Sequence, residues 1–336
     1  MTHDIPVIVT GGAGYIGSHF CKELARQGLR PITYDNLQRG HRGAVQWGPF
    51  EQGDLRDEQR LREVFNKHRP GAVVHFAALA YVGESVERPA LYYENNVVGT
   101  LCLLNAMREF DVSQIVFSST CATYGIPDKM PISETAPQHP INPYGETKLI
   151  VERMLRDFGE AYGMRWAALR YFNAAGADPD SETGEMHEPE THLIPLVLEA
   201  ASGRRSSISV FGNDYDTPDG TCIRDYIHVT DLATAHVKAL EWLSAGENRG
   251  AFNLGNGQGF SVEEVITSAR RVTGRDIPVV YTKRREGDPP RLIADARLAR
   301  DVLGWVPERR ELDDMVKDAW RWHLLHQESR PEAAAS

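Results

Sequence analysis

The stretch VIVTGGAGYIGSH (residues 7–19) places an apolar, β-branched run directly before closely spaced glycines. Gly12, Gly14 and Gly17 fit the pattern G-x-G-x-x-G, and Gly11, Gly14 and Gly17 fit the shifted pattern G-x-x-G-x-x-G. Both patterns meet one physical need: a tight turn, a backbone that comes close to a pyrophosphate, and a helix N-terminus that faces negative charge. The stretch therefore predicts a strand, a phosphate-binding loop and a helix in succession.

Short apolar runs alternate with helical patterns through the first half of the chain. We expect strands over residues 5–11, 30–36, 50–54, 71–78, 113–120 and 164–171. Strands that alternate with helices are typical of a parallel, doubly wound sheet. The fold class predicted here is therefore α/β and Rossmann-like.

The character of the sequence changes after Asn173, where loops lengthen and Pro, Gly and acidic residues accumulate over 175–192. We expect a dinucleotide-binding domain over residues 1–173. A smaller mixed α/β domain for the substrate follows over 174–328, and some of its segments are expected to return to the first domain. The tail 329–336 has no core-forming pattern and is expected to be flexible.

Composition excludes several classes of function. The chain has 336 residues and a formal net charge of −10, which argues against non-specific binding to nucleic acid or to an anionic membrane. No apolar run is long enough to span a bilayer, and the four scattered cysteines are simplest to place in a reducing cytoplasm. We expect no metal ion, because His75, His228 and His236 join no cluster at ligand spacing.

The second expected strand ends in Asp35, eighteen positions after Gly17. A carboxylate about 20 residues beyond the glycine loop grips the ribose 2′-hydroxyl of a dinucleotide. Its charge repels a 2′-phosphate, so NAD is favoured over NADP. Asp54 lies at the next strand end, within reach of an adenine amino group, although Asp at a strand end is also a common turn former.

The stretch NPYGETKLIVERML (residues 142–155) predicts a helix that begins at Asn142 and Pro143. Tyr144 and Lys148 lie four positions apart and share one helix face. Most such pairs are surface pairs, but a nicotinamide cofactor at the sheet edge gives this one a purpose. An ammonium and a positive nicotinamide ring both favour a phenolate, whose ordinary pKa is about 10. Lys148 is also expected to hydrogen-bond the cofactor ribose.

The strand that ends FSSTCATYG (117–125) supplies a hydroxyl, Thr120 or Ser119, to hold a substrate oxygen. Together, GGAGYIG, Asp35, SSTCATYG and Y-x-x-x-K resemble the extended short-chain dehydrogenases/reductases. Four further segments narrow the resemblance to the UDP-glucose 4-epimerases, and the match runs from about residue 5 to about residue 325. These segments are VGESVERPALYYENNVVGT (82–100), LRYFNAAGA (169–177), FGNDYDTPDGTCIRDYIHVTDLA (211–233) and RREGDPPRLIADA (284–296).

The resemblance implies a bound NAD, a UDP-hexose substrate in the second domain, and a homodimer packed through helices of the first domain. It implies that Thr120, Tyr144 and Lys148 are catalytic. The positions that it implies for NAD contacts are Gly11, Gly14, Tyr15, Ile16, Gly17, Asp35, Asn36, Asp54, Leu55, Phe76, Ala77, Ala78, Asn95, Tyr144, Lys148 and Phe172. Those that it implies for the UDP-sugar are Thr120, Asn173, His192, Leu193, Phe211, Arg224, Tyr226, Arg285, Asp288 and Leu292.

This chain departs from the family pattern at two of these positions. Thr120 replaces the more usual Ser, which preserves the hydroxyl. His192 stands where many members have Asn, so its contact with substrate is open. Arg224 and Arg285 fit a cationic clamp for a diphosphate, which an acidic chain needs.

The reaction implied is the reversible C4 epimerisation of UDP-glucose and UDP-galactose through a 4-keto intermediate. A nucleotide-sugar 4,6-dehydratase would need an acidic pair after the strand threonine, where this chain has Cys121 and Ala122. An NAD-sensing regulatory protein would need a damaged site, whereas Tyr144 and Lys148 are intact.

A broader UDP-sugar specificity, for N-acetylhexosamines or pentoses, remains open and is expected to depend on Leu292. The resemblance places this residue beside the 2-substituent of the sugar, where a bulky Tyr excludes N-acetylated sugars and a small residue admits them. Leu is branched and of intermediate volume, so we expect a preference for UDP-glucose and UDP-galactose. The alternative is that Leu292 only packs within the second domain.

Overall fold

The computed structural model describes residues 5–285 and 287–326, so the predicted tail 329–336 lies outside the described residues. Its centre is a seven-stranded sheet in which neighbouring strands run parallel. The strands are β1 (Pro6–Thr10), β2 (Arg30–Asp35), β3 (Phe50–Gln52), β4 (Ala72–His75), β5 (Gln114–Thr120), β6 (Arg165–Tyr171) and β11 (Arg249–Leu254). Their order, β3-β2-β1-β4-β5-β6-β11, reverses direction between β1 and β4, as in doubly wound folds. The predicted fold class is confirmed.

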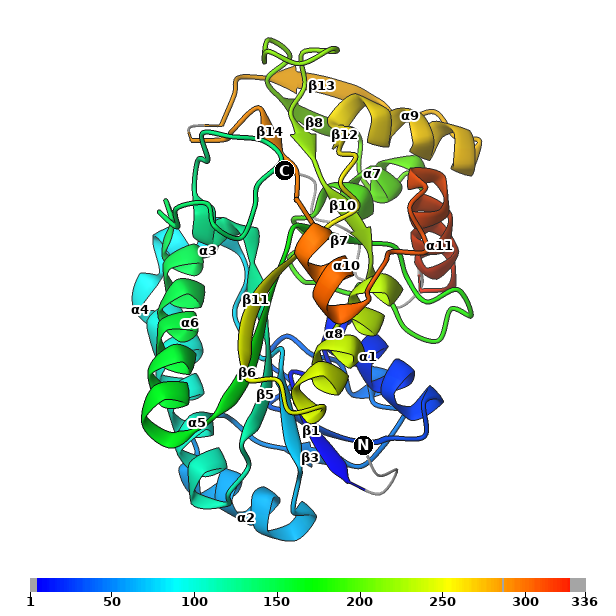
Figure 1. Cartoon of the computed structure of the whole chain (residues 1–336). Coiled ribbons are helices and arrows are strands. Elements are labelled where there is room, and N and C mark those ends of the chain that lie inside the picture. The colour runs from blue at the N-terminus through cyan, green and yellow to red at the C-terminus, as the bar shows by residue number, and fades with distance from the viewer. Residues whose placement is uncertain (1–4, 286, 327–336) are drawn as a thin grey trace.

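Helices cover both faces of this sheet (Figure 1). On one face lie α1 (Tyr15–Arg26), α8 (Val229–Ser244) and α10 (Arg297–Leu303), and on the other lie α2 (Glu58–His68), α5 (Gly99–Glu109) and α6 (Pro143–Tyr162). The strands are apolar on both faces and form one core cluster with each helix layer. Shorter helical pieces are η1 (Arg42–Ala44), α3 (Val82–Glu87), α4 (Pro89–Tyr92), the π-helix η2 (Tyr93–Val98) and η3 (Cys121–Tyr124).

A smaller region lies beyond the carboxyl ends of the central strands, in the upper part of Figure 1. Its strands are β7 (Asn173–Ala175), β8 (Ile208–Phe211), β9 (Ile223–Arg224), β10 (Tyr226–His228), β12 (Phe260–Ser261), β13 (Val279–Thr282) and β14 (Arg291–Leu292). Its helices α7 (Leu193–Ala201), α9 (Val262–Thr273) and α11 (Leu312–Leu325) enclose a core of their own. Most of these strands are short, and long loops connect them.

The two regions are not two consecutive blocks of sequence. Both α8 and β11 follow residue 173, yet α8 packs on α1 and β11 extends the central sheet beside β6. The chain therefore crosses between the regions several times, and their shared boundary lies along the carboxyl edge of the central sheet.

Candidate functional site

The glycine loop joins β1 to α1, and Gly11 and Gly17, at its two ends, have no room for a side chain. Gly11 has a φ of +72°, and a Cβ there would lie 2.5 Å from the Ala77 amide nitrogen. A Cβ on Gly17 would lie 2.2 Å from the Gly11 carbonyl oxygen. No side chain caps α1, because its N-cap residue is Gly14. The first backbone amides of α1 therefore receive no hydrogen bond from a capping side chain, which suits the binding of a pyrophosphate.

Asp35 ends β2 and is 8% exposed. Its carboxylate accepts hydrogen bonds from the amides of Ala13 (3.1 Å) and Leu37 (2.8 Å), which fix it beside the glycine loop. Burial raises the pKa of this carboxyl above its ordinary value, and the two amide hydrogen bonds oppose that rise. The placement fits a ribose-binding carboxylate.

The Asp54 side chain forms the turn contact, which is one of the two roles that the sequence left open for it. Its carboxylate accepts a hydrogen bond from the Arg56 backbone amide (2.9 Å), which closes the turn, and it also pairs with the Arg56 guanidinium. It also accepts a hydrogen bond of 3.0 Å from the side-chain amide of Asn36, the residue that follows Asp35. The hydrogen bonds from Arg56 hold the pKa of Asp54 well below its usual range. Asp54 thus orders the rim of the site, and an adenine contact stays a prediction.

The remaining residues predicted to contact NAD surround the same edge. Phe76, Ala77 and Ala78 follow β4, and the amides of the first two donate to the Thr10 carbonyl. Phe172 follows β6 and is 8% exposed. Leu55 is buried. The Tyr15 hydroxyl donates a hydrogen bond of 2.6 Å to the Gly176 carbonyl, which joins the end of the glycine loop to the second region. Ile16 packs against the α1–α8 core, and Asn95 lies in η2.

Thr120 and Tyr144 lie together at the switch from β5 to α6. Thr120 is the last residue of β5, and its hydroxyl accepts from the Ala122 amide at 3.2 Å. Asn142 caps α6 through a 2.8 Å bond from the Gly145 amide, which places Tyr144 in the first turn. Burial raises the pKa of the Tyr144 phenol well above its ordinary value, and a hydrogen bond with Thr120 opposes the rise.

Lys148 lies one turn further along α6 and is buried. Its ammonium donates 2.8 Å to the Ser118 carbonyl and lies 6.0 Å from the centroid of the Tyr144 ring. Burial lowers the pKa of Lys148 to about 7, while Glu152 opposes that change. Burial therefore raises the pKa of the Tyr144 phenol, whereas the charge of Lys148 was expected to lower it.

A buried ion pair behind these residues was not predicted from the sequence. Arg170 of β6 makes two hydrogen bonds to the Glu152 carboxylate, at 2.9 and 2.6 Å. The Ser119 hydroxyl donates to the same carboxylate at 2.6 Å. Glu152 lies one turn below Lys148 on α6, so the ion pair fixes α6 against β6, and the Ser119 hydrogen bond fixes it against the end of β5. The spacing of four residues between Lys148 and Glu152 is the feature of the sequence that could have indicated a partner for this helix face.

The residues predicted to bind the UDP-sugar come from short strands and loops of the second region. Arg224 of β9 forms an ion pair with Asp288, and Leu292 lies beside Arg224 in the parallel pair β14–β9. Asn173 and Tyr226 lie opposite each other in the β7–β10 pair. Leu292 packs on a cluster that includes Tyr124 and Phe172. Arg224, Asp288 and Leu292 are therefore together in this structure.

Arg285 and Phe211 form a second contact of this region. The Arg285 guanidinium carbon lies 3.8 Å from the centroid of the Phe211 ring, which ends β8. Such a cation–π contact holds the guanidinium group in place, and its N–H groups can still bind an anion.

His192 is held by acidic side chains. Its Nδ1 lies 2.7 Å from Glu185 and 3.1 Å from Glu190. Burial opposes the charge on this imidazole, but the two carboxylates prevail and raise its pKa to about 10. Leu193 follows as the first residue of α7. A contact of either residue with substrate stays a prediction.

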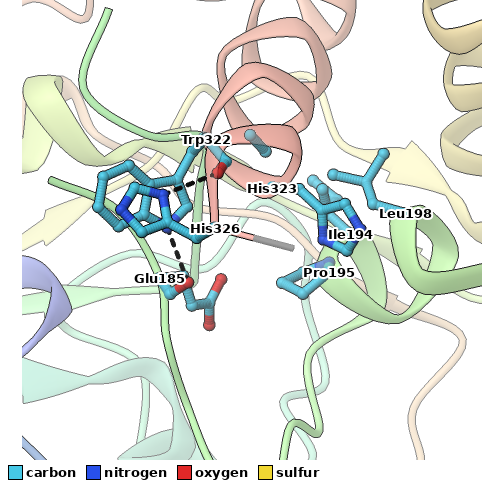
Figure 2. A pocket seen from close by; sticks show the side chains of 9 residues that line it. Glu185, Ile194, Pro195, Leu198, Trp322, His323 and His326 are labelled. Atoms are coloured by element: carbon cyan, nitrogen blue, oxygen red, sulfur yellow. Dashed lines mark hydrogen bonds between the residues drawn. The ribbon is translucent and has the colours of Figure 1, made fainter. Parts of the chain in front are cut away.

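A small cavity near Glu185 is not the site for a nucleotide sugar. Its volume is about 20 Å³, room for about one water molecule. Figure 2 shows the Trp322 indole donating to the Glu185 backbone carbonyl at its wall, at 3.1 Å. The lining residues are Gly176, Glu185, Ile194, Pro195, Leu198, Ala319, Trp322, His323 and His326.

Comparisons with known proteins identify the class of site. Residues 7–255 match the model of the NAD dependent epimerase/dehydratase family. The chain belongs to this family. It is 55% identical to a UDP-glucose 4-epimerase of Rhizobium leguminosarum bv. trifolii over 317 residues, which is 94% of this chain and 97% of that protein.

Solved structures of family members agree. A UDP-glucose 4-epimerase from Brucella ovis, crystallised in complex with NAD, superposes with a TM-score of 0.93 at 56% identity and covers 94% of this chain and 98% of its own. The enzyme from Bifidobacterium longum, in complex with NAD+ and UDP, gives a TM-score of 0.91 at 38% identity, covering 97% and 100%. The predicted resemblance, the enzyme class and the NAD cofactor are confirmed.

The structure also bears on the membrane prediction. Among residues 5–285 and 287–326, no helix is long and apolar enough to cross a membrane.

Proposed function

We propose that this chain interconverts UDP-glucose and UDP-galactose by inverting C4, with NAD bound throughout the cycle. The observation that supports this most is the grouping of Thr120, Tyr144 and Lys148 at the carboxyl edge of the sheet, beside the glycine loop and Asp35. A phenol, a hydroxyl and a buried amine next to a dinucleotide site are the groups that a reversible alcohol oxidation needs.

The proposal gives each of these residues a defined task. Tyr144 removes the proton of the 4-hydroxyl, directly or through Thr120, and returns a proton in the second half of the cycle. Lys148 holds the cofactor ribose and adds positive charge near the phenol. When bound at the glycine loop, Asp35 and Lys148, NAD would supply the acceptor and then the donor of the C4 hydride. The second region holds the UDP group while the 4-keto sugar turns its other face, with Arg224 and Arg285 at the diphosphate and Asp288 at another part of the UDP-sugar.

The 4,6-dehydratase alternative finds no support at Cys121. Burial raises the pKa of this thiol to about 12, so it cannot exchange protons near neutral pH. The residue after it, Ala122, has no acidic group.

A panel of UDP-sugars, incubated with purified protein and no added NAD, tests the proposal. We expect UDP-glucose and UDP-galactose to interconvert, and denaturation to release NAD rather than NADP. A dehydrated product, or no turnover of either hexose, would contradict it.

We propose in addition a cytoplasmic homodimer that packs through the first region. Its support is a set of exposed apolar side chains on successive helical elements: Val82 and Val86 of α3, Tyr93 and Val98 of η2, and Leu101 of α5. Such a series is typical of an interface rather than of free surface. Leu101→Asp should shift the mass measured by light scattering from dimer to monomer, and Leu298→Asp, an exposed leucine on α10, should not.

A further inference from the structure

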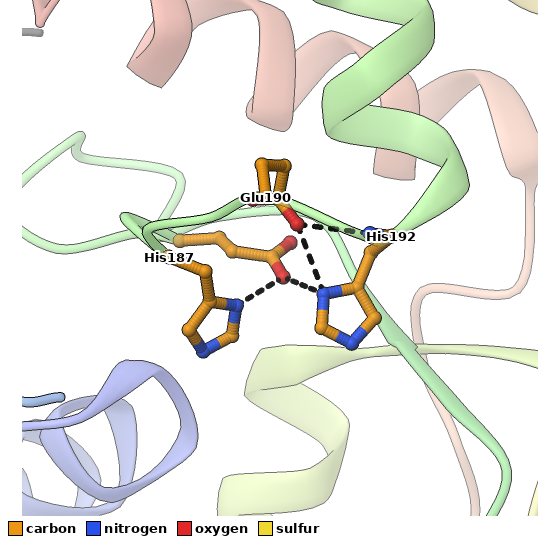
Figure 3. Close-up of side chains that lie close together, drawn as sticks. His187, Glu190 and His192 are labelled. Carbon is orange, nitrogen blue, oxygen red and sulfur yellow. Dashed lines mark hydrogen bonds and ion pairs between the residues drawn. The ribbon is translucent and has the colours of Figure 1, made fainter. Parts of the chain in front are cut away.

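Four potential metal ligands converge in the loop between β7 and α7. Glu185, His187, Glu190 and His192 each offer one ligand atom, and these atoms all lie within 4.8 Å of one another. Figure 3 shows both imidazoles turned toward the carboxylates. The prediction of no metal ion rested on His75, His228 and His236, and the E-x-H-x-x-E-x-H spacing of residues 185–192 was not part of it.

The distances within the cluster suit a small cation. His187 Nδ1 lies 2.9 Å and His192 Nδ1 2.7 Å from the same oxygen, Oε1 of Glu185. In a tetrahedral zinc site, metal–ligand bonds of about 2.0–2.2 Å separate the donor atoms by about 3.3–3.5 Å. The two contacts to Glu185 would therefore have to lengthen by about half an ångström to admit an ion, and any ligand atoms as far as 4.8 Å apart would have to move closer together. Two imidazole nitrogens and two carboxylate oxygens are a donor set that zinc-type cations accept.

An unsatisfied oxygen points independently to a ligand. The Glu190 side chain is 5% exposed. Its Oε1 accepts from the amides of Thr191 and His192, but its Oε2 is buried and has no hydrogen-bond partner among the described residues. A buried carboxylate oxygen without a partner costs free energy, and a cation would satisfy it. Glu185 is also buried, so the cluster brings the carboxylates of Glu185 and Glu190 together beside the two imidazoles.

The neighbouring acidic cluster provides a contrast. Asp178, Asp180 and Glu182 also lie within ligand distance of one another, but the Lys22 ammonium already pairs with all three. Two of its members are exposed. That cluster therefore needs no ion and contains no imidazole.

The segment 185–192, here called the bridging segment, connects the two regions. Its backbone carbonyl at Glu188 accepts from Arg39 (2.8 Å), and the carbonyl at Met186 contacts His41 Nε2 (2.6 Å), both from the loop after β2. The His187 ring lies edge-on to the ring of Tyr15 in α1, with the centroids 6.3 Å apart. At its other end the segment leads into α7. An ion here would hold the loop after β2 and the start of α7 together.

We propose that Glu185, His187, Glu190 and His192 form a structural site for one zinc-type divalent cation that fixes the bridging segment. This goes beyond the proposed function, because the site supplies no group to the reaction. The test of this proposal measures metal content. The metal site can therefore be disproved while the epimerase activity is confirmed, and the activity can be disproved while the metal site is confirmed.

The test uses the full chain, expressed without a polyhistidine tag and exposed to Zn²⁺ before gel filtration. Mass spectrometry of the metal should find about one zinc per chain, and a chelator should lower the thermal midpoint reversibly. Cobalt in its place should give the visible absorption of a tetrahedral site. Less than about a tenth of an ion per chain, with no cobalt spectrum, would overturn the proposal whatever the variants do.

Two variants and two controls locate the ion. His187→Gln and Glu190→Gln should each weaken zinc binding about tenfold or more, since even groups behind the ligands cost 10–100-fold. His139→Gln changes an exposed histidine, and Asp180→Asn changes an exposed member of the other cluster. Both controls should keep one ion per chain. Retention of the ion by the two ligand variants would overturn the assignment to these side chains.

Discussion

The two halves of the candidate site are built in different ways. The cofactor half comprises the glycine loop, Asp35, Thr120, Tyr144 and Lys148, and each of these ends a strand of the central sheet or begins a helix beside it. The substrate half, at Arg224, Asp288 and Leu292 among others, stands on two-residue strands and loops. Regular elements fix groups that must meet a reacting atom, whereas loops can vary to select among sugars.

The interactions that fix the two halves differ in the same way. In the cofactor half, apolar layers on both sides of the sheet and the buried Arg170–Glu152 pair hold α6 in place. In the substrate half, the buried Asp225 carboxylate accepts from three loop amides, those of Asn256 (2.7 Å), Gly257 (3.0 Å) and Ala294 (3.0 Å). Chemistry should therefore depend on single side chains of the first half, and affinity on the loop contacts of the second.

The largest effect is expected at Tyr144. Tyr144→Phe removes the proton-transfer group and keeps the ring, so kcat should fall by about 10²–10⁴-fold. The fold and the bound NAD should persist, as measured by circular dichroism and by nucleotide released on denaturation. Tyr162→Phe, at the exposed end of the same helix, is the matched control and should keep full activity. Normal turnover by Tyr144→Phe would break the assignment of chemistry to the cofactor half.

A change at Asp225 should affect affinity instead. Asp225→Asn leaves one acceptor oxygen for three amides, which should cost about 1–3 kcal/mol in the loops around the UDP-sugar. The expected result is a higher KM for UDP-galactose, with NAD content unchanged and kcat less affected than KM. Loss of NAD from this variant would show that the two halves are not separable. Asp276→Asn, a loop carboxylate after α9, serves as the control.

Leu292→Ser sharpens the comparison within the substrate half. If Leu292 crowds a 2-acetamido group, overpacking of about 1–3 kcal/mol is relieved, which corresponds to about one to two factors of ten. Activity on UDP-N-acetylglucosamine should rise by that factor relative to UDP-glucose. Equal catalytic efficiency of the unaltered enzyme on both sugars would show that Leu292 only packs against Tyr124 and Phe172.

The smallest effect on activity is expected at Glu51, which lies in β3 far along the sheet from α6. Burial opposes the charge on Glu51, but hydrogen bonds from Lys67, His68 and Arg60 prevail and lower its pKa to about 2. Because the folded pKa lies below the ordinary value of about 4.5, the carboxylate stabilises the fold above pH 4.5. This contribution is lost as the pH falls toward 2.

Glu51→Gln should therefore lower the free energy of unfolding at pH 7 by about 2 kcal/mol, and the difference from the unaltered chain should shrink as the pH falls from 4.5 to 2. Denaturant titrations at several pH values measure it. Turnover at pH 7 should not change. A difference that is constant with pH would rule out the carboxylate as its source.

The same contrast explains what could be predicted from the sequence. The glycine spacing, Asp35 and the Tyr144–Lys148 pair were predictable because strand and helix periods fix where such side chains point. The return of β11 to the central sheet was less visible, because a strand of residues 249–254 carries no sign of its neighbour. The Arg170–Glu152 pair and the cluster at Glu185 depend on contacts between segments far apart in sequence or in an irregular loop, which no local period encodes.

The central claim is that C4 is inverted by a hydride that leaves and returns within one site. UDP-glucose labelled with deuterium at C4 tests it directly, with the product examined by NMR and a parallel reaction of unlabelled substrate run in D₂O. UDP-galactose should keep the deuterium at C4 and take none from the solvent. Loss of the label to water, or solvent deuterium at C4, would contradict it.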